Sequence, residues 1–273
     1  MVEVATGTDE LLCEITDRVA TITLNKPHKK NALGDVLTPA LRRTVAALEH
    51  DERVGCVVLT GTGDAFCAGG DVSGMGPSSA PAAEHKPTPQ DRVADLVHKQ
   101  VTLTQRIHEL SKITIAALPG PAAGAGLSIA LACDVRLASS NAFVTTAFKN
   151  IGLSGDYGSS WFLPRLIGLA KAKELFYTAD RVDAEEGLRL GIFNKVFPQA
   201  DFRREAFEYA RGIANGPTQA LARMKTNLNE GVNQSLRDSL ELEARQLISS
   251  MGSAEAKEAI AAFMEKRPPV FHS

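Results

Sequence analysis

The chain has 273 residues, enough for one large domain or for a domain with an appendage. Apolar residues make up 44% and charged residues 23% of the chain, as in ordinary globular proteins. The formal net charge of −2 argues against a basic, polyanion-binding surface, so we expect no nucleic-acid partner.

The composition predicts a cytoplasmic protein that binds neither a membrane nor a metal. Residues 1–7 are acidic and poor in apolar side chains, unlike a signal peptide, and no apolar run approaches membrane-spanning length. There is no Cys-x-x-Cys pair and no His-x-x-x-His pair, which are spacings that metal sites use. The four cysteines are expected to be small buried thiols in a reducing compartment: Cys13, Cys56, Cys67 and Cys133.

Strands and helices are expected to alternate through most of the chain. Residues 11–25 alternate apolar and polar side chains and break at Asp17-Arg18, which predicts a β-hairpin. Asp35 is expected to cap a helix that continues to His50. Residues 73–90 hold four prolines and two glycines, which predicts a mobile loop. The other elements expected are a strand over 54–60, a helix over 91–110, a strand over 113–118, a helix over 124–133, a strand over 135–138 and a helix from Ser159.

The pattern changes after Phe197. Strands that alternate with helices predict an α/β fold with parallel pairing, whereas the residues beyond Phe197 show only helical patterns. We therefore expect an α/β core over 1–199 and a helical subdomain over 200–273. The four helices expected in that subdomain cover 200–214, 218–230, 235–250 and 254–266.

Two glycine-rich turns carry the most information about function. Residues 65–71, AFCAGGD, and 120–126, GPAAGAG, each follow a β-branched apolar run and precede a helical stretch. A turn of small residues between a strand and a helix exposes backbone N–H groups at the helix N-terminus. Two such ends that converge would form an anion or oxyanion site without any side chain.

These turns have two other interpretations. A dinucleotide-binding motif fails, because its third glycine position holds Ile129 and no acidic residue follows at the required distance. Tight packing of strands against helices remains an alternative, since small residues let these elements approach closely.

As a pair, the turns are similar to one family. Residues 66–71 and 120–126, followed by ALACD at 130–134, resemble motifs of the enoyl-CoA hydratase/isomerase (crotonase) family. Three further segments resemble that family in the same order: 25–33, NKPHKKNAL; 152–165, GLSGDYGSSWFLPR; and 183–196, DAEEGLRLGIFNKV. The resemblance covers nearly the whole chain.

The resemblance implies an α/β fold: a crotonase (ClpP-like) spiral of ββα units with a C-terminal helical region for trimerisation. It implies an acyl-CoA substrate and no cofactor apart from the CoA thioester itself. It also implies assembly as a homotrimer or as a dimer of trimers.

The resemblance also assigns roles near the thioester. The oxyanion donors would be the backbone N–H groups of Ala68 and Ala125, where alanine suffices because the peptide is the donor. Family hydratases activate water with two glutamates, and those positions hold Ser128 and Phe148 here. Phenylalanine cannot move a proton, and serine without an adjacent base is a poor substitute.

Asp156 is the candidate catalytic carboxylate. Several isomerases of the family and a dehalogenase branch place their working carboxylate in this turn, so the resemblance implies that Asp156 acts there. The alternative is an ordinary N-cap or turn aspartate. An apolar wall made by Phe148, Tyr157 and Trp161 is expected to raise the pKa of Asp156, although these aromatic residues are also plausible as plain core.

Other residues would bind the thioester or CoA. Asp71 more often caps the following backbone in such turns, and surface lysines are more often simply solvated. By family analogy, Lys266 would reach the CoA of a neighbouring subunit. The full set of expected binding residues is Lys29, Lys30, Ala68, Gly69, Gly70, Asp71, Gly124, Phe148 and Lys266.

The function predicted from the sequence is double-bond isomerisation of an enoyl-CoA through an enolate, with Asp156 moving the proton. The turn around Asp156 resembles enoyl and ring-epoxide isomerases of fatty-acid and phenylacetate breakdown. Two alternatives stay open. One is an enoyl-CoA hydratase of fatty-acid β-oxidation, and the other is a member that binds acyl-CoA without catalysis.

Overall fold

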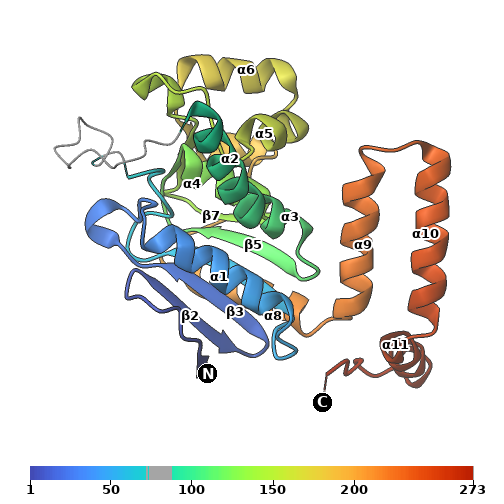
Figure 1. Cartoon of the computed structure of the whole chain (residues 1–273). Coiled ribbons are helices and arrows are strands. Elements are labelled where there is room, and N and C mark those ends of the chain that lie inside the picture. The colour runs from blue at the N-terminus through green and yellow to red at the C-terminus, as the bar shows by residue number, and fades with distance from the viewer. Residues whose placement is uncertain (72, 74–87, 273) are drawn as a thin grey trace.

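The computed structural model describes residues 1–71, 73 and 88–272 of the chain. Most of the loop predicted over 73–90 lies outside these described residues. The rest forms a β-sheet core covered by helices, and the C-terminal helices stand to one side of it (Figure 1).

A seven-stranded sheet forms the centre of the core. Its strands in spatial order are β1 (Val2–Glu3), β2 (Leu11–Thr16), β3 (Val19–Leu24), β4 (Cys56–Gly61), β5 (Ile113–Leu118), β7 (Val135–Ser139) and β10 (Lys195–Phe197). The pairs β1–β2 and β2–β3 are antiparallel, and the pairs from β3 to β10 are parallel. Asp17 and Arg18 have positive φ values of 47° and 66°, as a two-residue hairpin turn requires. The predicted hairpin and parallel pairing are thus confirmed.

A second, smaller sheet lies beside the first. Its strands in spatial order are β6 (Ala122–Ala123), β8 (Phe143–Thr145) and β9 (Val182–Asp183). Because β6 belongs to the second glycine-rich turn, this sheet fixes the entry into the helix that follows.

Alternate residues of the central strands face two separate hydrophobic clusters, as the pleat of a strand requires. Ile22 and Leu59 pack on one face with Leu41 of helix α1 (Leu37–Glu49). Val58 packs on the other face with Phe202 of helix α8 (Phe202–Ala214). Both faces are buried, which explains why the parallel strands are apolar throughout.

The remaining helices include those that were predicted, together with α6 and α7, and the helix predicted over 91–110 is divided into three elements. They are α2 (Pro89–Gln100), the π-helical turn η3 (Val101–Gln105), α3 (Arg106–Glu109), α4 (Ala125–Ala132), α5 (Ser159–Ile167), α6 (Leu169–Thr178), α7 (Ala184–Arg189), α9 (Thr218–Gly231), α10 (Leu236–Met251) and α11 (Ala254–Glu265), with short 3-10 turns η1 (Pro27–Lys29) and η4 (Phe148–Ile151).

Helices α1 and α2 do not begin as the sequence predicts. The N-cap of α1 is Val36, which makes no side-chain cap bond, so the predicted Asp35 cap is wrong. Helix α2 begins earlier than expected, because Thr88 and Asp91 form a capping box around its N-terminus.

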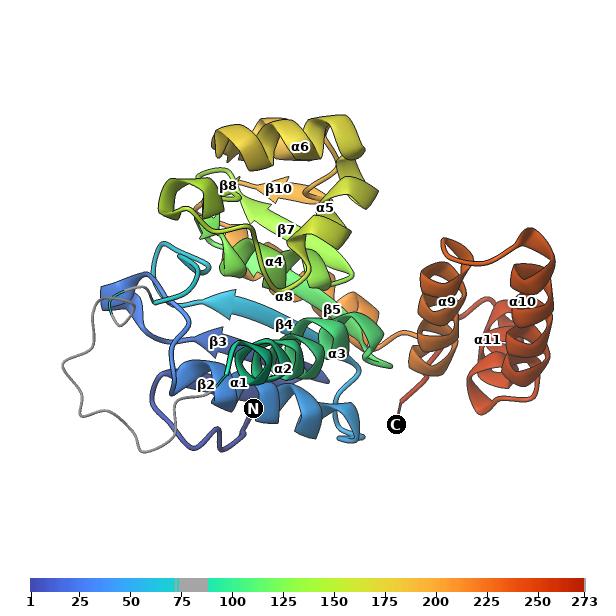
Figure 2. The ribbon, with the colours of Figure 1, turned by 45° about the horizontal axis from the view of Figure 1, so that its top comes forward.

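The boundary between core and helical subdomain also differs from the prediction. Helix α8 lies within 200–273, yet Phe202 and Ala206 pack against the central sheet. Only α9, α10 and α11 stand away from the sheet (Figure 2). The separate helical part therefore begins after α8.

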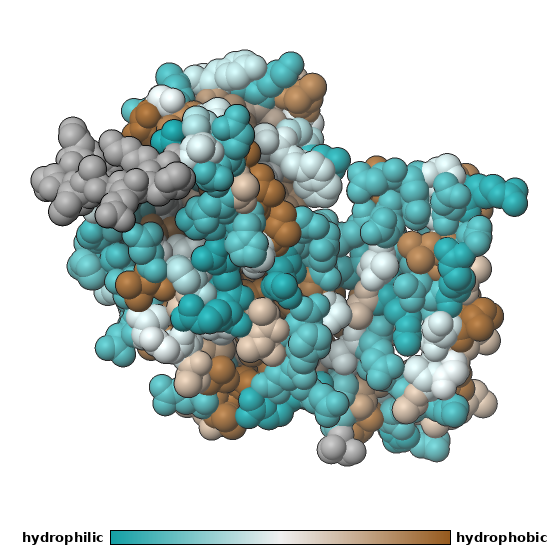
Figure 3. Space-filling view, in the orientation of Figure 1, coloured by the Kyte–Doolittle hydropathy of each residue, from teal (hydrophilic) through white to brown (hydrophobic). Residues whose placement is uncertain are grey.

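The C-terminal helices are joined to the core through a buried ion pair. Lys225 Nζ of α9 lies 2.8 Å from Asp134 Oδ2, which also accepts hydrogen bonds from Thr114. Apolar side chains remain exposed on this part of the molecule, some of them visible in Figure 3: Leu228, Val232, Leu236, Leu240, Leu247, Ile248, Met251, Ile260, Phe263 and Met264. Among the described helices, none combines the length and the apolar character that crossing a bilayer requires.

All four thiols are buried, as predicted. Burial raises the pKa of Cys13 to about 11 and the pKa values of Cys67 and Cys133 to about 12, and it also raises the pKa of Cys56. Because the thiolate is the reactive form, we expect no reaction of the native protein with a disulfide reagent at pH 8. Denaturant should release all four thiols. Rapid stoichiometric labelling of the native protein would contradict this prediction.

Candidate active site

Backbone hydrogen bonds hold the two glycine-rich turns against each other. Phe66 and Cys67 donate their N–H groups to the Pro121 carbonyl oxygen at 3.0 and 3.2 Å. Ala123 N–H donates to the Cys67 carbonyl oxygen at 3.0 Å. The two turns, far apart in the sequence, are therefore neighbours in space.

Glycines permit this close approach. A Cβ atom on Gly126 would lie 2.7 Å from Cys67 Cβ and 2.8 Å from Cys67 Sγ, closer than packed atoms come. Gly69 has a φ of 99°, and a Cβ there would lie 2.9 Å from the Ala123 carbonyl oxygen. Tight packing is therefore one role of these turns, and it places the N-terminus of α4 beside Gly69.

Ala125 presents an open hydrogen-bond donor. It is the first residue of α4, and its N-cap Gly124 (φ 51°, ψ −125°) has no side chain that could accept a bond. Nothing within residues 1–71, 73 and 88–272 accepts a hydrogen bond from the Ala125 N–H. The Ala68 N–H differs, because it donates to the Lys30 carbonyl oxygen at 2.9 Å. Of the two predicted oxyanion donors, the structure leaves one open.

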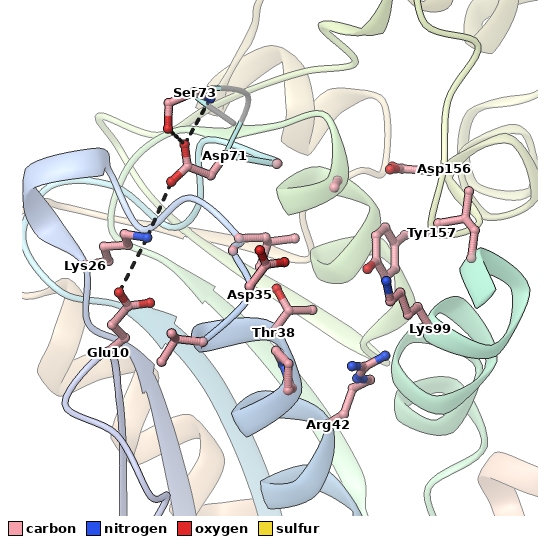
Figure 4. A pocket seen from close by; sticks show the side chains of 17 residues that line it. Glu10, Lys26, Asp35, Thr38, Arg42, Asp71, Ser73, Lys99, Asp156 and Tyr157 are labelled. Carbon is pink, nitrogen blue, oxygen red and sulfur yellow. Dashed lines mark hydrogen bonds and ion pairs between the residues drawn. The ribbon is translucent and has the colours of Figure 1, made fainter. Parts of the chain in front are cut away.

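A cavity of about 480 Å³ lies beside the turns. Its wall includes Gly70 and Ala125 from the turns and Asp156 from the loop before α5. A Cβ on Gly70 would meet no atom within 4 Å, so this glycine keeps the wall open. The other labelled side chains around the cavity are Glu10, Lys26, Asp35, Thr38, Arg42, Asp71, Ser73, Lys99 and Tyr157 (Figure 4).

Asp156 sits in a loop of unusual backbone conformation. Gly155, Tyr157 and Gly158 have positive φ values of 109°, 51° and 84°. The Oδ1 atom of Asp156 is buried and has no hydrogen-bond partner among the described residues. Burial raises the pKa of Asp156 from 3.8 to about 6. A carboxylate of this kind is ionised at neutral pH and is more basic than an exposed aspartate, as a general base should be.

Ser128 holds the backbone of Asp156. Its buried hydroxyl lies 3.0 Å from the Asp156 carbonyl oxygen and 3.2 Å from the Gly124 carbonyl oxygen. A hydroxyl has one proton to donate, so these two acceptors share it. The position of a family hydratase glutamate is therefore occupied here by a residue that connects α4 to the Asp156 loop.

Two of the three predicted wall aromatics lie outside the cavity. Phe148 is buried and stacks on Phe176 at 6.2 Å between ring centroids. It is not among the residues that line this cavity, so its role in binding stays a prediction. Trp161 instead contacts His108 at 5.3 Å between ring centroids, in a different cavity. Tyr157 does line the Asp156 cavity. A Cβ atom on Gly124 or on Gly155 would lie 3.7 Å from the Phe148 ring, so this ring packs beside the loop that holds Asp156.

The three lysines predicted to bind CoA lie in different surroundings. Lys29 Nζ lies 2.7 Å from Asp71 Oδ2, and this contact lowers the pKa of Asp71 well below its usual range. Asp71 also accepts from Ser73 N–H at 3.2 Å, which confirms its capping role. Lys30 ends the η1 turn with a φ of 48° and does not line the cavity. Lys266 follows α11 and is not among the residues that line this cavity.

Sequence patterns missed several cavity residues. Arg42 of α1 and Lys99 of α2 line the cavity together with Thr38, although none of them belongs to a recognisable motif. A helical residue at the edge of an apolar stripe faces solvent or a cavity depending on which elements pack beside it. No local signal in the sequence separates these two outcomes.

The comparison with known families decides the identity of the fold. The sequence model for the enoyl-CoA hydratase/isomerase family matches residues 14–273. The chain belongs to the enoyl-CoA hydratase/isomerase family. A crystal structure of an enoyl-CoA hydratase from Polaromonas sp. JS666 superposes with a TM-score of 0.86 at 32% identity, covering 95% of this chain and 98% of that one. The predicted crotonase fold with C-terminal helices is therefore confirmed.

Relatives within the family carry out different reactions. The 4-chlorobenzoyl coenzyme A dehalogenase-1 of Arthrobacter sp. is 36% identical over 258 residues, which cover 93% of this chain and 90% of the relative. The 1,2-epoxyphenylacetyl-CoA isomerase of Escherichia coli is 31% identical over 261 residues, which cover 96% and 97%. Membership in this enzyme family thus leaves the reaction to be argued from the site.

Proposed function

We propose that this family member is an enoyl-CoA isomerase, which converts a 3-enoyl-CoA into a 2-enoyl-CoA. One observation carries the proposal. Among the residues that the structure describes, a buried carboxylate oxygen of Asp156 and the N–H of Ala125 both lack a hydrogen-bond partner, and the two residues line one cavity. A base and an oxyanion donor on one cavity are the minimum that an enolate mechanism requires.

The reaction would proceed in two proton transfers. The thioester oxygen accepts a hydrogen bond from Ala125 N–H, and the Asp156 carboxylate removes a proton from C2. The electron pair forms a dienolate whose charge lies on the thioester oxygen. Asp156 then returns the proton at C4, and the double bond moves to C2–C3. The step balances without a metal or any cofactor beyond the CoA thioester.

Ala68 would contribute the second oxyanion donor. Its N–H points to the Lys30 carbonyl oxygen at 2.9 Å, so a bound thioester would share this donor with Lys30 in a three-centre bond. Among the predicted CoA-binding residues, Lys30 and Lys266 would meet phosphate groups as exposed cations, and Lys266 would do so from a neighbouring subunit.

Hydration is less well supported by the side chains. The Ser128 hydroxyl donates its proton to the Asp156 carbonyl oxygen, and Phe148 is buried against Phe176. Neither residue can take a proton from water. A hydratase would therefore have to use Asp156 as its sole acid and base.

Dehalogenation of an aryl-CoA is the second candidate. It is favoured by the 36% identity to the Arthrobacter dehalogenase, together with an Asp156 oxygen that has no partner within the described part of the chain. In that reaction the carboxylate would attack the halogen-bearing carbon, halide would leave, and water would hydrolyse the aryl ester. This mechanism needs Asp156 as a nucleophile rather than as a base.

A substrate panel separates these candidates. We expect conversion of 3-hexenoyl-CoA to the conjugated thioester, followed by its absorbance, with slow hydration of 2-hexenoyl-CoA and no chloride release from 4-chlorobenzoyl-CoA. Rapid hydration or stoichiometric chloride release would overturn the isomerase proposal in favour of the corresponding reaction. Tight thioester binding without any turnover would instead identify a non-catalytic binding protein.

We also propose a homotrimer or a dimer of trimers. Helices α10 and α11 expose apolar side chains such as Leu247, Ile248 and Phe263, which a monomer would leave in water. Light scattering on the purified protein checks this, and a monomer at micromolar concentration would contradict it.

A further inference from the structure

The backbone beside Asp156 is held by a side chain from a distant helix. Gln100 Oε1 accepts a hydrogen bond from Tyr157 N–H at 2.8 Å. Gln100 is the last residue of α2, and the π-helical turn η3 begins immediately after it. Such widened turns are frequent at functional sites. The contact spans 57 positions along the chain, so it reflects tertiary placement.

Tyr157 needs this support. It is a buried, non-glycine residue with a φ of 51°, a conformation that is unfavourable for a bulky side chain. Its N–H belongs to the same peptide group as the Asp156 carbonyl. The hydroxyl groups of Ser128 and Ser159 donate to that carbonyl oxygen at 3.0 and 3.2 Å. Gln100 binds the N–H on the opposite side of the same peptide group, and it is the side chain that accepts there.

We propose that Gln100 is a positioning residue that fixes the Asp156 carboxylate in the cavity by accepting the Tyr157 N–H. The inference rests on the proposed function, in which Asp156 is the base. Through this bond, the placement of α2 is coupled to the placement of the catalytic carboxylate. The amide oxygen is identified by its partner, because an N–H group can donate only to the oxygen of the glutamine side chain.

Other charges that face this cavity could also act on Asp156. They are Glu10, Lys26, Asp35, Arg42, Asp71 and Lys99. Burial is the cause of the raised pKa of Asp156. Loosening of the Tyr157 loop would admit water to the carboxylate, and its pKa would then fall toward that of an ordinary aspartate.

The test compares three variants in the full chain. Gln100→Met keeps the length of the side chain and removes the acceptor. Gln100→Glu keeps an acceptor oxygen and adds a negative charge near Asp156. Gln105→Met is the matched control, because Gln105 lies in the adjoining turn and its exposed side chain donates to Glu109, with no other side-chain bond among the described residues. For each variant, the dependence of kcat/KM on pH is measured with 3-hexenoyl-CoA, alongside the melting temperature.

Each variant has a distinct expected result. For Gln100→Met, kcat should fall by on the order of 10- to 100-fold. The acid limb of its kcat/KM profile should move to a lower pH than in the wild type. For Gln100→Glu, most of the activity should remain, and the acid limb should move upward because a like charge is added. Gln105→Met should leave kcat and the acid limb of the pH profile unchanged. If Gln100→Met lowers only the melting temperature while kcat and the acid limb stay at wild-type values, the positioning role is overturned.

A second readout separates this inference from the proposed function. If Asp156→Asn were as active as wild type, the isomerase mechanism would fail. The carboxyl titration of Asp156 can still be followed by carbon-13 NMR in protein labelled at aspartate. A downward shift of that titration in Gln100→Met but not in Gln105→Met supports the positioning role, and identical titrations in both variants overturn it.

Discussion

Replacement of Asp156 by asparagine is expected to lower kcat for isomerisation of 3-hexenoyl-CoA by about 100- to 10,000-fold. The amide has nearly the same shape but cannot accept the C2 proton. Binding of the thioester should change little, because the oxyanion donors are backbone groups. Steady-state kinetics with a separate measurement of Kd for a saturated acyl-CoA checks both statements.

The matched control is Asp35→Asn, since Asp35 lines the same cavity and has no role in the proposed mechanism. It should retain activity within a few-fold. The wild-type rate should rise with pH through about 6, because burial raises the pKa of Asp156 to that value and only the ionised carboxylate is a base. An asparagine variant with wild-type kcat, or a rate that falls as pH rises from 5 to 7, would exclude Asp156 as the base.

The second large effect is expected for Ala125→Pro, which removes the open N–H donor. Proline is accepted at the first residue of a helix. Gly124 before it has φ 51° and ψ −125°, outside the extended region that a residue before proline prefers, so the fold of this variant is checked together with its activity. Loss of one oxyanion donor costs on the order of 100- to 1,000-fold in kcat. Circular dichroism should show an intact fold while isomerase activity is lost.

Ala125→Gly provides the control for this experiment. It retains the N–H group and removes only a methyl group, so its kcat should stay within several-fold of wild type. Equal losses in the proline and glycine variants would mean that the alanine methyl, rather than the donor, matters at this position. A fully active proline variant would remove Ala125 from the mechanism.

Much of the fold was predictable from the sequence because local patterns and long-range packing agree. The period-two pattern of 11–25 and the apolar run of 54–60 specify strands, and both faces of the sheet are covered. The Asp35 cap failed for a local reason. Asp35 lies two residues before the helix start at Leu37, whose N-cap is Val36. Helix α8 was assigned to the helical subdomain but packs on the central sheet, because the periodicity of a helix does not reveal which element its apolar face contacts.

The site was predictable only in part. The two turns and Asp156 stand in recognisable motifs, so their residues could be named from the sequence. Gln100 could not, because its bond to Tyr157 depends on how α2 and the Asp156 loop pack together. The surroundings of Phe148 could not be predicted for a related reason. A buried aromatic residue next to a catalytic loop can line the cavity or support the loop from behind, and its sequence position is the same in both cases.

The tie between Ser128 and Asp156 also bears on how this chain could change its chemistry during evolution. A glutamate at position 128 would introduce an acid of the hydratase type, but it would remove the hydroxyl that now holds the Asp156 carbonyl at 3.0 Å. The first substitution on a path toward hydration would thus weaken the existing reaction before a second acid replaced Phe148. We expect variants with only one of the two substitutions to catalyse both isomerisation and hydration poorly. Stepwise evolution from one activity to the other would therefore pass through less active proteins.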